Sequence, residues 1–548
     1  MKRLFLMLFT ILSFFAVFKL YLTPQFPYTH DGENHLARFA NYKIALREGQ
    51  FPPRFAPNLL NGFGYPVFNY NYPLANILSV PFSLLNIHYE LTFKILVIAS
   101  LIVGAVGLVL WLKKLSAANT GVFLALNTWI SAPYLVNLLY FRGNIGEILA
   151  YAILPWAFFC IESLKTLTSK RSHFLRVFYV SLVFVALLLS HNIVGVLGIS
   201  LLTLFAVCRL LDNKKNLLRF ILALAWSVGL TAWFWIPALL ELRYIVLSTA
   251  ASIYGFSNHF VTLRQFLWAP LSFGFSYPGS VDSLSFSIGA SGMFTILTSL
   301  ALSQKNIFKK YHLLHIVVVL ALCILQLQFS APIWNIVPAL SFVQFPWRLG
   351  IFISVLLAPL IAKIAPKSTL FSRLFLILLV FQVAVVLKTS PILYFHREEI
   401  EYDLYAASTS TENENLPNSF TYEYFEENNH SKSVVEPQVL SGSASISLSS
   451  WSGSKRSYSA LVEEETVLVE PTMNFPGWET HITQGNTTKK VLYVQDREIA
   501  GRIAYSLSPG EYTVISKFTQ NTPARLLGNT VSVLALAAGV FAIWKRRG

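Results

Sequence analysis

The sequence predicts an α-helical polytopic membrane protein of about twelve transmembrane helices, with a C-terminal β-rich domain outside the membrane. Of its 548 residues, 54% are hydrophobic and only 13% are charged, which is outside the usual balance of soluble globular proteins. Apolar stretches of about 17 to 22 residues, long enough for a spanning helix, recur along most of the chain. Between residues 395 and 525, Ser, Thr, Glu and Asn replace Leu and Phe.

The apolar stretches define the predicted spans. In chain order they cover residues 4–22, 91–112, 117–138, 148–164, 174–190, 193–211, 217–238, 284–302, 311–328, 348–364, 372–389 and 526–544. The formal net charge is +15, but the basic residues form no long tract, so nucleic acid is not an expected partner. The three cysteines lie inside apolar segments without the spacing of a metal site.

Basic residues between the spans predict the orientation, because short loops rich in Lys and Arg stay cytoplasmic. Lys2 and Arg3 precede the first span, and Lys113 and Lys114 follow the second. The other basic residues expected on this side are Lys165, Lys170, Arg171, Lys214, Lys215, Lys305, Lys309, Lys310, Lys363, Lys367, Lys545, Arg546 and Arg547. Both termini should therefore be cytoplasmic. A cleaved signal peptide is the alternative interpretation of the first span, but the alternation requires that this helix is retained.

Three parts are expected along the chain. Residues 1–394 form the transmembrane domain, with a long first outer loop over 23–90. Residues 395–525 form an extracytoplasmic domain, in which alternating runs such as "SASISLS" and "EYTVISKF" predict the short strands of a β-sandwich. Residues 526–548 form the last transmembrane helix and a basic cytoplasmic tail.

The first outer loop contains the polar stretch "THDGENHLARF". In a helix that starts near Asp31, the side chains of Asp31, His35, Arg38 and Tyr42 share one face. Asp31 would then lie at the outer membrane surface, close to the end of the first span. The alternative is that Asp31 only caps the helix N-terminus, a position that favours Asp.

Further ionisable residues are expected at helix ends on the same side of the membrane. They are Arg142 and Glu147 in "FRGNIGE", His191 in "SHN", Glu241 and Arg243 in "ELRY", Arg264, and Arg348 in "QFPWRLG". A single residue of this kind is often an anchor that extends to the interface. Because so many lie at helix ends on one side, we expect a polar cavity at the outer leaflet.

Such a cavity suits glycosyl transfer from a lipid-linked donor. A carboxylate next to a hydroxyl group acts as a general base, and fixed guanidinium groups stabilise a departing phosphate. The sequence contains no glycine-rich nucleotide loop, which favours a donor delivered in the membrane over a nucleotide sugar.

A family resemblance supports this interpretation. The early Asp of "THDGENHLARF" after an N-terminal span resembles the GT-C class of integral-membrane glycosyltransferases, in which such a loop Asp is the catalytic base. The stretch from Leu46 to Leu74, "FRGNIGE" and "FPWRLG" resemble the bacterial and archaeal membrane family called 6-pyruvoyl-tetrahydropterin synthase related. The C-terminal "NFPGWETHI" and "LSPGEYTVISKF" resemble the end of YfhO-like membrane proteins.

The resemblance implies a GT-C-like fold and an inverting transferase in the plasma membrane, with Asp31 as general base on the extracytoplasmic face. The donor would be a polyprenyl-phosphate-linked sugar, and the acceptor a glycan, lipid or protein. Glu147 occupies the position of an acid that holds a divalent metal in oligosaccharyltransferases, but the chain lacks their "WWD" motif, so a metal is possible and not required.

The other candidate residues are assigned from the expected topology. His35, Arg38 and Glu147 should lie near the acceptor, and the lipid phosphate should bind Arg142, His191, Arg264 and Arg348. Two alternatives remain open. One is a transporter or flippase for a lipid-linked glycan, although transporters place their charges near the bilayer midplane. The other is a non-catalytic protein of envelope-glycan assembly.

Overall fold

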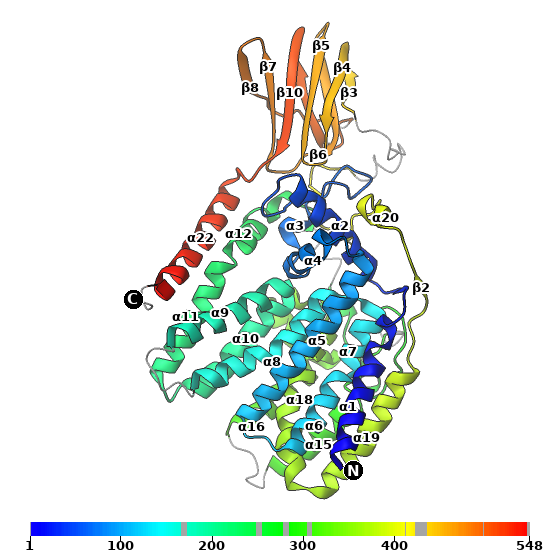
Figure 1. The fold of residues 1–548 in the computed structure, drawn as a ribbon, viewed down its shortest axis with the longest axis vertical. Coiled ribbons are helices and arrows are strands. Elements are labelled where there is room, and N and C mark those ends of the chain that lie inside the picture. The colour runs from blue at the N-terminus through cyan, green and yellow to red at the C-terminus, as the bar shows by residue number, and fades with distance from the viewer. Residues whose placement is uncertain are drawn as a thin grey trace.

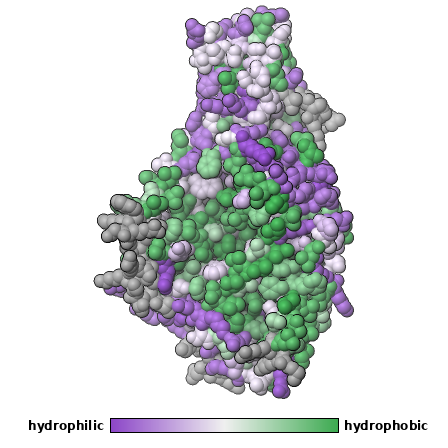
Figure 2. Space-filling model, in the orientation of Figure 1, coloured by the Kyte–Doolittle hydropathy of each residue, from purple (hydrophilic) through white to green (hydrophobic). Residues whose placement is uncertain are grey.

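The structure is a computed structural model that describes residues 2–165, 173–247, 255–277, 284–303, 310–410, 413–421, 436–496 and 498–544. Several basic residues used to predict the orientation lie outside these ranges, namely Lys170, Arg171, Lys305, Lys309, Lys545, Arg546 and Arg547. The helices form one body, and the strands form a separate domain at one end of it (Figure 1). Figure 2 shows a broad apolar surface over the helices and mostly hydrophilic side chains over the strands.

The predicted fold class is confirmed. The long helices are α1 (Lys2–Phe18), α5 (Tyr89–Lys114), α6 (Asn119–Ile130), α8 (Ile145–Lys165), α9 (His173–Ser190), α10 (Asn192–Leu210), α11 (Lys214–Leu230), α12 (Ala232–Leu240), α15 (Ala290–Ser303), α16 (Lys310–Gln326), α18 (Gly350–Ile364), α19 (Thr369–Lys388) and α22 (Pro523–Trp544). Each predicted span overlaps at least one of them.

Length and hydropathy together support fewer spans than the predicted twelve. In the described ranges, eight helices are long and apolar enough to cross a membrane, or nine if the α11–α12 pair, bent by 64°, is one span. The predicted spans 174–190, 284–302 and 311–328 correspond to shorter apolar helices, Leu175–Ser190, Ala290–Ser303 and Lys310–Gln326. A helix of 17 residues is only about 25 Å long, so each of these three is shorter than a hydrocarbon core of about 30 Å.

The first loop is folded and anchored to the helices. It contains β1 (Phe26–Pro27), α2 (Gly32–Arg47), α3 (Val67–Tyr70) and α4 (Leu74–Leu84). Buried Lys94 on α5 donates hydrogen bonds of 2.8 to 2.9 Å to the carbonyl oxygens of residues 23, 24 and 25. All three ammonium protons are thereby used, which fixes the chain just before the polar stretch.

A segment after α19 returns along this loop. Its strand β2 (Tyr394–Phe395) pairs antiparallel with β1, and α20 (Glu399–Asp403) packs on α2. Glu90, buried at the start of α5, accepts hydrogen bonds of 3.0 Å from the Tyr402 hydroxyl and the Arg397 backbone N–H. These contacts join parts of the chain that are about three hundred residues apart.

The C-terminal domain consists of two packed sheets. One has five antiparallel strands in the order β4-β5-β10-β7-β8, and the other has three in the order β3-β6-β9. The strands are β3 (Gln438–Ser441), β4 (Ala444–Trp451), β5 (Lys455–Val462), β6 (Thr466–Met473), β7 (Trp478–Gln484), β8 (Thr487–Lys490), β9 (Arg502–Leu507) and β10 (Gly510–Phe518). In β5 and β10, buried and exposed residues alternate, as the period of a half-buried strand requires.

A buried ion pair joins this domain to the helices. Arg525 of α22 bonds to Glu241, which follows α12, at 3.0 Å, and Glu241 also accepts from Asn69 of the first loop at 2.9 Å. Arg525 donates a further bond of 2.9 Å to the carbonyl of Thr519, which follows β10. The guanidinium is 0% exposed, so one charge pair holds the loop, two helices and the domain together.

Candidate active site

The polar stretch around Asp31 is held by the backbone before α8. The N–H of His30 donates to the carbonyl of Phe141 at 3.0 Å, and the N–H of Asp31 donates to that of Arg142 at 2.8 Å. Gly143 lies in the left-handed region with φ +64°, and a Cβ there would lie 2.1 Å from Thr29 Oγ1. The close approach of the two segments therefore requires glycine.

The side chain of Asp31 does not cap α2. Asp31 occupies the N-cap position, but its carboxylate makes no capping hydrogen bond. Thr29 Oγ1 instead accepts from the N–H of Gly32 at 3.1 Å. The half-buried carboxylate of Asp31 accepts a bond of 3.0 Å from Asn144 Nδ2. This finding argues against the alternative that Asp31 acts only as a cap.

Glu147, near the start of α8, is the centre of a buried charged group. Its Oε2 accepts from Arg142 Nη1 and from the Tyr134 hydroxyl, both at 2.7 Å. Its Oε1 accepts from Arg348 Nε at 3.1 Å, and the side chain is 0% exposed. Both oxygens are thus bonded to cations or hydroxyls, as a buried carboxylate requires.

Each guanidinium of this group also lies on an aromatic ring. Arg142 lies 4.7 Å from the ring centre of Trp347, and Arg348 lies 5.0 Å from that of Phe345. The single carboxylate of Glu147 balances only one of the two positive charges. Asp31 is near enough to Arg142 for their charges to attract, so it is the second anion beside this site.

His191 and Tyr72 pack against each other next to Asn144 and Glu147. His191 Nδ1 accepts from the N–H of Val194 at 3.3 Å, which caps α10 and leaves the proton of the neutral ring on Nε2. That nitrogen lies 3.7 Å from Glu147 Oε1, beyond hydrogen-bond length. Tyr72 stacks on the His191 ring at 4.7 Å and donates from its hydroxyl to Asn144 Oδ1 at 3.1 Å.

The remaining predicted residues lie differently. His35 is buried with its ring 6.0 Å from that of Tyr72, and burial lowers its pKa well below the usual value. Arg38 donates from Nε to Thr409 Oγ1 at 3.0 Å, so it ties α2 to the segment before the β domain. Arg264 is exposed on the short helix α14 (Leu263–Leu267). Among the contacts that the described residues make, none joins Arg264 to Asp31 or Glu147.

Sequence reasoning missed several residues of this site. They are Asn144, Tyr72, Tyr134, Trp347 and His30. Asn144 lies inside the motif "FRGNIGE", between the predicted site residues Arg142 and Glu147. This position was the one signal for Asn144, because an uncharged amide contributes nothing to a charge pattern. His30 packs flat on Phe275 at 4.6 Å. Its pKa is lowered to about 4 by burial and by the charge of Arg142, against the opposing charge of Asp31.

The donor set around Glu147 does not fit a divalent metal. Both carboxylate oxygens are already bonded, and two guanidinium groups beside them would repel a dication. In the part of the chain that the structure describes, no group of three or more His, Cys, Asp or Glu side chains has the arrangement of a metal site.

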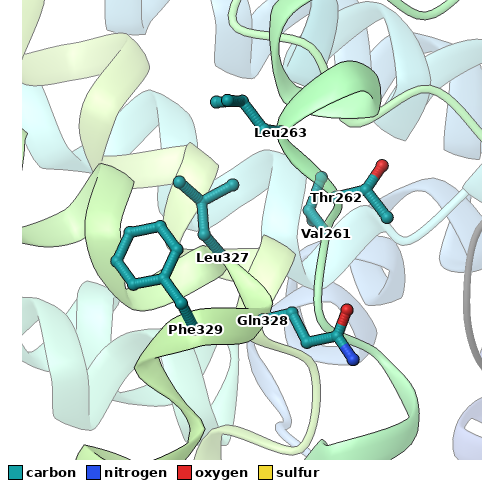
Figure 3. Close-up of a pocket in the computed structure, with 6 residues that line it drawn as sticks. All are labelled: Val261, Thr262, Leu263, Leu327, Gln328 and Phe329. Carbon is teal, nitrogen blue, oxygen red and sulfur yellow. The ribbon is translucent and has the colours of Figure 1, made fainter.

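A shallow groove of about 410 Å³ lies elsewhere, between the segment before α14 and the turn after α16. Figure 3 shows the side chains of Leu263, Leu327 and Phe329 around one open space. Apart from Thr262 and Gln328, its lining is apolar, and no predicted site residue lines it. The groove is therefore separate from the charged group.

The helical body is apolar, and a buried charged group lies where its first loop meets the helix ends. These features define a polytopic membrane protein with a polar site. The chain belongs to the membrane-protein family described as "6-pyruvoyl-tetrahydropterin synthase related domain; membrane protein", whose match covers residues 68–395, more than half of the chain. This confirms the resemblance seen in the sequence.

Individual relatives are distant. An uncharacterized protein of Lactococcus lactis subsp. cremoris (strain MG1363) is 25% identical over 285 residues, which are 49% of this chain and 44% of the relative. This chain therefore spans less than half of that relative's length. Among solved structures, arabinofuranosyltransferase AftD from Mycobacteria is similar at a TM-score of 0.42 and 18% identity, over 71% of this chain and 26% of that chain. A mutant of the same protein gives 0.45 and 14%, over 71% and 28%.

Proposed function

We propose that this protein is a GT-C type glycosyltransferase that transfers a sugar from a polyprenyl-phosphate-linked donor to a glycan, lipid or protein acceptor, with inversion. The observation that carries the proposal is the Asp31 carboxylate, half-buried and oriented by Asn144, beside two guanidinium groups that share one buried carboxylate. A carboxylate base and fixed guanidinium groups that face the departing phosphate are what the transfer needs.

In the proposed reaction, the acceptor hydroxyl oxygen attacks the anomeric carbon of the donor and its proton passes to Asp31. The bond between the anomeric carbon and the phosphate oxygen breaks, and its electron pair leaves with the phosphate. The products are the glycosylated acceptor and the polyprenyl phosphate. Attack from the face opposite the leaving group inverts the anomeric configuration.

Arg142, Arg348 and His191 are the proposed phosphate ligands. Each guanidinium has five N–H donors, and Glu147 takes one bond from each. Arg348 Nη1 also donates to the carbonyl of Val343 at 2.9 Å, so Arg348 keeps Nη2 for the phosphate. Trp347 and Phe345 hold the planes of these groups from one side. The cations are therefore fixed before the substrate arrives, which lowers the cost of reorganisation during the reaction. In this proposal Glu147 orients the arginines and is not itself the base.

The proposed location is the plasma membrane, with both termini cytoplasmic and the site on the extracytoplasmic face. The donor would reach the arginines from the lipid, and the acceptor would reach Asp31 from water on the side of the β domain. The proposed outer domain comprises residues 395–525. His35 and Arg38 support α2 near the acceptor, and the exposed Arg264 has the weakest structural support as a phosphate ligand.

The two alternatives are distinguishable by experiment. In membranes that contain the full chain, transfer of labelled sugar from a panel of synthetic undecaprenyl-phosphate sugars should fall about 100-fold or more in Asp31→Asn. Asp403→Asn is a matched control, because Asp403 also lies near the first loop but bonds to Tyr89 at 2.9 Å. It should keep wild-type transfer.

Unchanged transfer in Asp31→Asn would overturn the proposed role of Asp31. Movement of the lipid-linked sugar between leaflets without any transfer would favour the flippase. Absence of both activities, with every donor of the panel, would favour the assembly protein.

A further inference from the structure

A groove opens on the helical body between α1, α5 and α6, which lie together near the N-terminus (Figure 1). Its volume is about 450 Å³. Helix α6 has only 12 residues, and it packs on both α1 and α5. The groove runs along α6, whose residues begin one apolar span over Asn119–Arg142.

The two ends of the groove differ in chemistry. Leu6, Ile11 and Phe123 are among the apolar side chains that line most of it. At the other end, the exposed Lys113 donates from Nζ to Asn119 Oδ1. An ammonium group has three donors, so this bond leaves two protons of Lys113 for another ligand.

The walls of the groove belong to the surface that meets lipid. The 18-residue windows of α1 and α5 have mean hydropathies of 2.1 and 2.8, and both helices qualify as membrane spans. Met7 and Ile11, which line the groove, are 54% and 57% exposed. In a membrane the apolar part of the groove therefore faces hydrocarbon, while Lys113 at the end of α5 reaches the headgroup level.

The electrostatics favour a negative headgroup. The sequence has no Asp or Glu between residues 91 and 146 or before residue 31. Glu90, the one acidic residue of α1, α5 and α6, lies at the opposite end of α5 from Lys113, so it does not oppose an anion there. Basic pockets between transmembrane helices bind anionic lipid headgroups.

We propose that this groove binds one anionic diacyl phospholipid, with an acyl chain between α1 and α5 and its phosphate on Lys113. The site lies apart from Asp31 and does not depend on the proposed glycosyl transfer. A bound lipid would fill the groove and would connect α1, which packs mainly on α6 and α19, to α5.

The test compares two neighbouring lysines. The full chain, purified in a neutral detergent, is titrated with phosphatidylglycerol or phosphatidylcholine, and bound lipid is counted by native mass spectrometry. Lys113→Ala should weaken phosphatidylglycerol binding about fivefold. Lys114→Ala makes the same charge change but Lys114 does not line the groove, so its binding should stay near that of wild type.

A second variant tests the apolar part. Ile11→Trp, which fills the groove from an exposed position of α1, should abolish retention of phosphatidylglycerol while the apparent Tm stays within the range of the other variants. Equal losses in the two lysine variants would show a diffuse charge effect and overturn the site. Equal retention of phosphatidylcholine and phosphatidylglycerol by wild type, or no retained lipid, would overturn it as well.

Discussion

Asn144 Nδ2 donates a hydrogen bond of 3.0 Å to Asp31 Oδ2, while Asn144 Oδ1 accepts one of 3.0 Å from the backbone N–H of Glu147. The Asn144 amide thus connects the half-buried carboxylate of Asp31, in the first loop, to the start of α8, where the buried carboxylate of Glu147 lies. The amino group of Asn144 can only donate and its carbonyl oxygen can only accept, so the two hydrogen bonds together fix the orientation of the amide. The direction in which Asp31 presents its carboxylate is therefore set from α8 and not only from α2.

Asn144→Ala should lower kcat/KM for glycosyl transfer about ten- to hundredfold, because a hydrogen bond to a charged group contributes about 1.5 to 3 kcal/mol. Asn192→Ala is the control, because Asn192 bonds to the carbonyl of Tyr70 at 2.7 Å and does not touch Asp31. Equal losses of kcat/KM in the two variants would contradict a specific role of Asn144 in orienting Asp31.

Glu147→Gln should destabilise the protein strongly. The change leaves two guanidinium groups, with side chains 8% and 5% exposed, without their carboxylate, and breaking a buried ion pair costs about 3–5 kcal/mol. The apparent Tm in detergent measures the loss. Glu162→Gln is the comparison, because Glu162 pairs with one guanidinium, that of Arg209, which is 23% exposed. A larger loss in Glu162→Gln than in Glu147→Gln would contradict this ranking.

Gly143→Ala should abolish transfer and lower the apparent Tm. A methyl group there would lie 2.1 Å from Thr29 Oγ1 and 2.9 Å from the backbone nitrogen of Gly32, so the Asp31 segment has to move. Gly485, in the turn between β7 and β8, has a similar φ of +55° but no atom within 4 Å of such a methyl. Gly485→Ala therefore isolates the backbone strain, and it should keep activity. Similar losses in both variants would refute the steric explanation.

The stability of the protein should fall as pH decreases from about 6.5 toward 4, in part because of His30. Its pKa is lowered to about 4 in the folded state by burial and Arg142. Between these values the unfolded chain binds more protons than the folded one, so the contribution of His30 is complete above pH 6.5 and is lost on acidification. His30→Gln should flatten the curve of apparent Tm against pH. Parallel curves for the two proteins would contradict this assignment.

Much of the site was visible in the sequence as a set of residues, but not as an arrangement. The spacing of "THDGENHLARF" predicted one helical face with Asp31, His35 and Arg38, and in the structure α2 contains His35 and Arg38 and has Asp31 at its N-cap. Arg38 nevertheless bonds to Thr409, 371 residues away, and Glu147 collects Arg142 and Arg348 from two other segments. Helical period is a local property, whereas the partner of a long charged side chain depends on which segments pack together.

The sequence by itself determined the membrane class, because runs of apolar residues must leave water whatever the topology, and the β-rich domain, because its alternation has a period of two. The tertiary structure decided that the arginines share Glu147 and that Asn144 orients Asp31. A buried charge has to be paired at short range. Which cation reaches which carboxylate is thus fixed only when the helices and the first loop have packed.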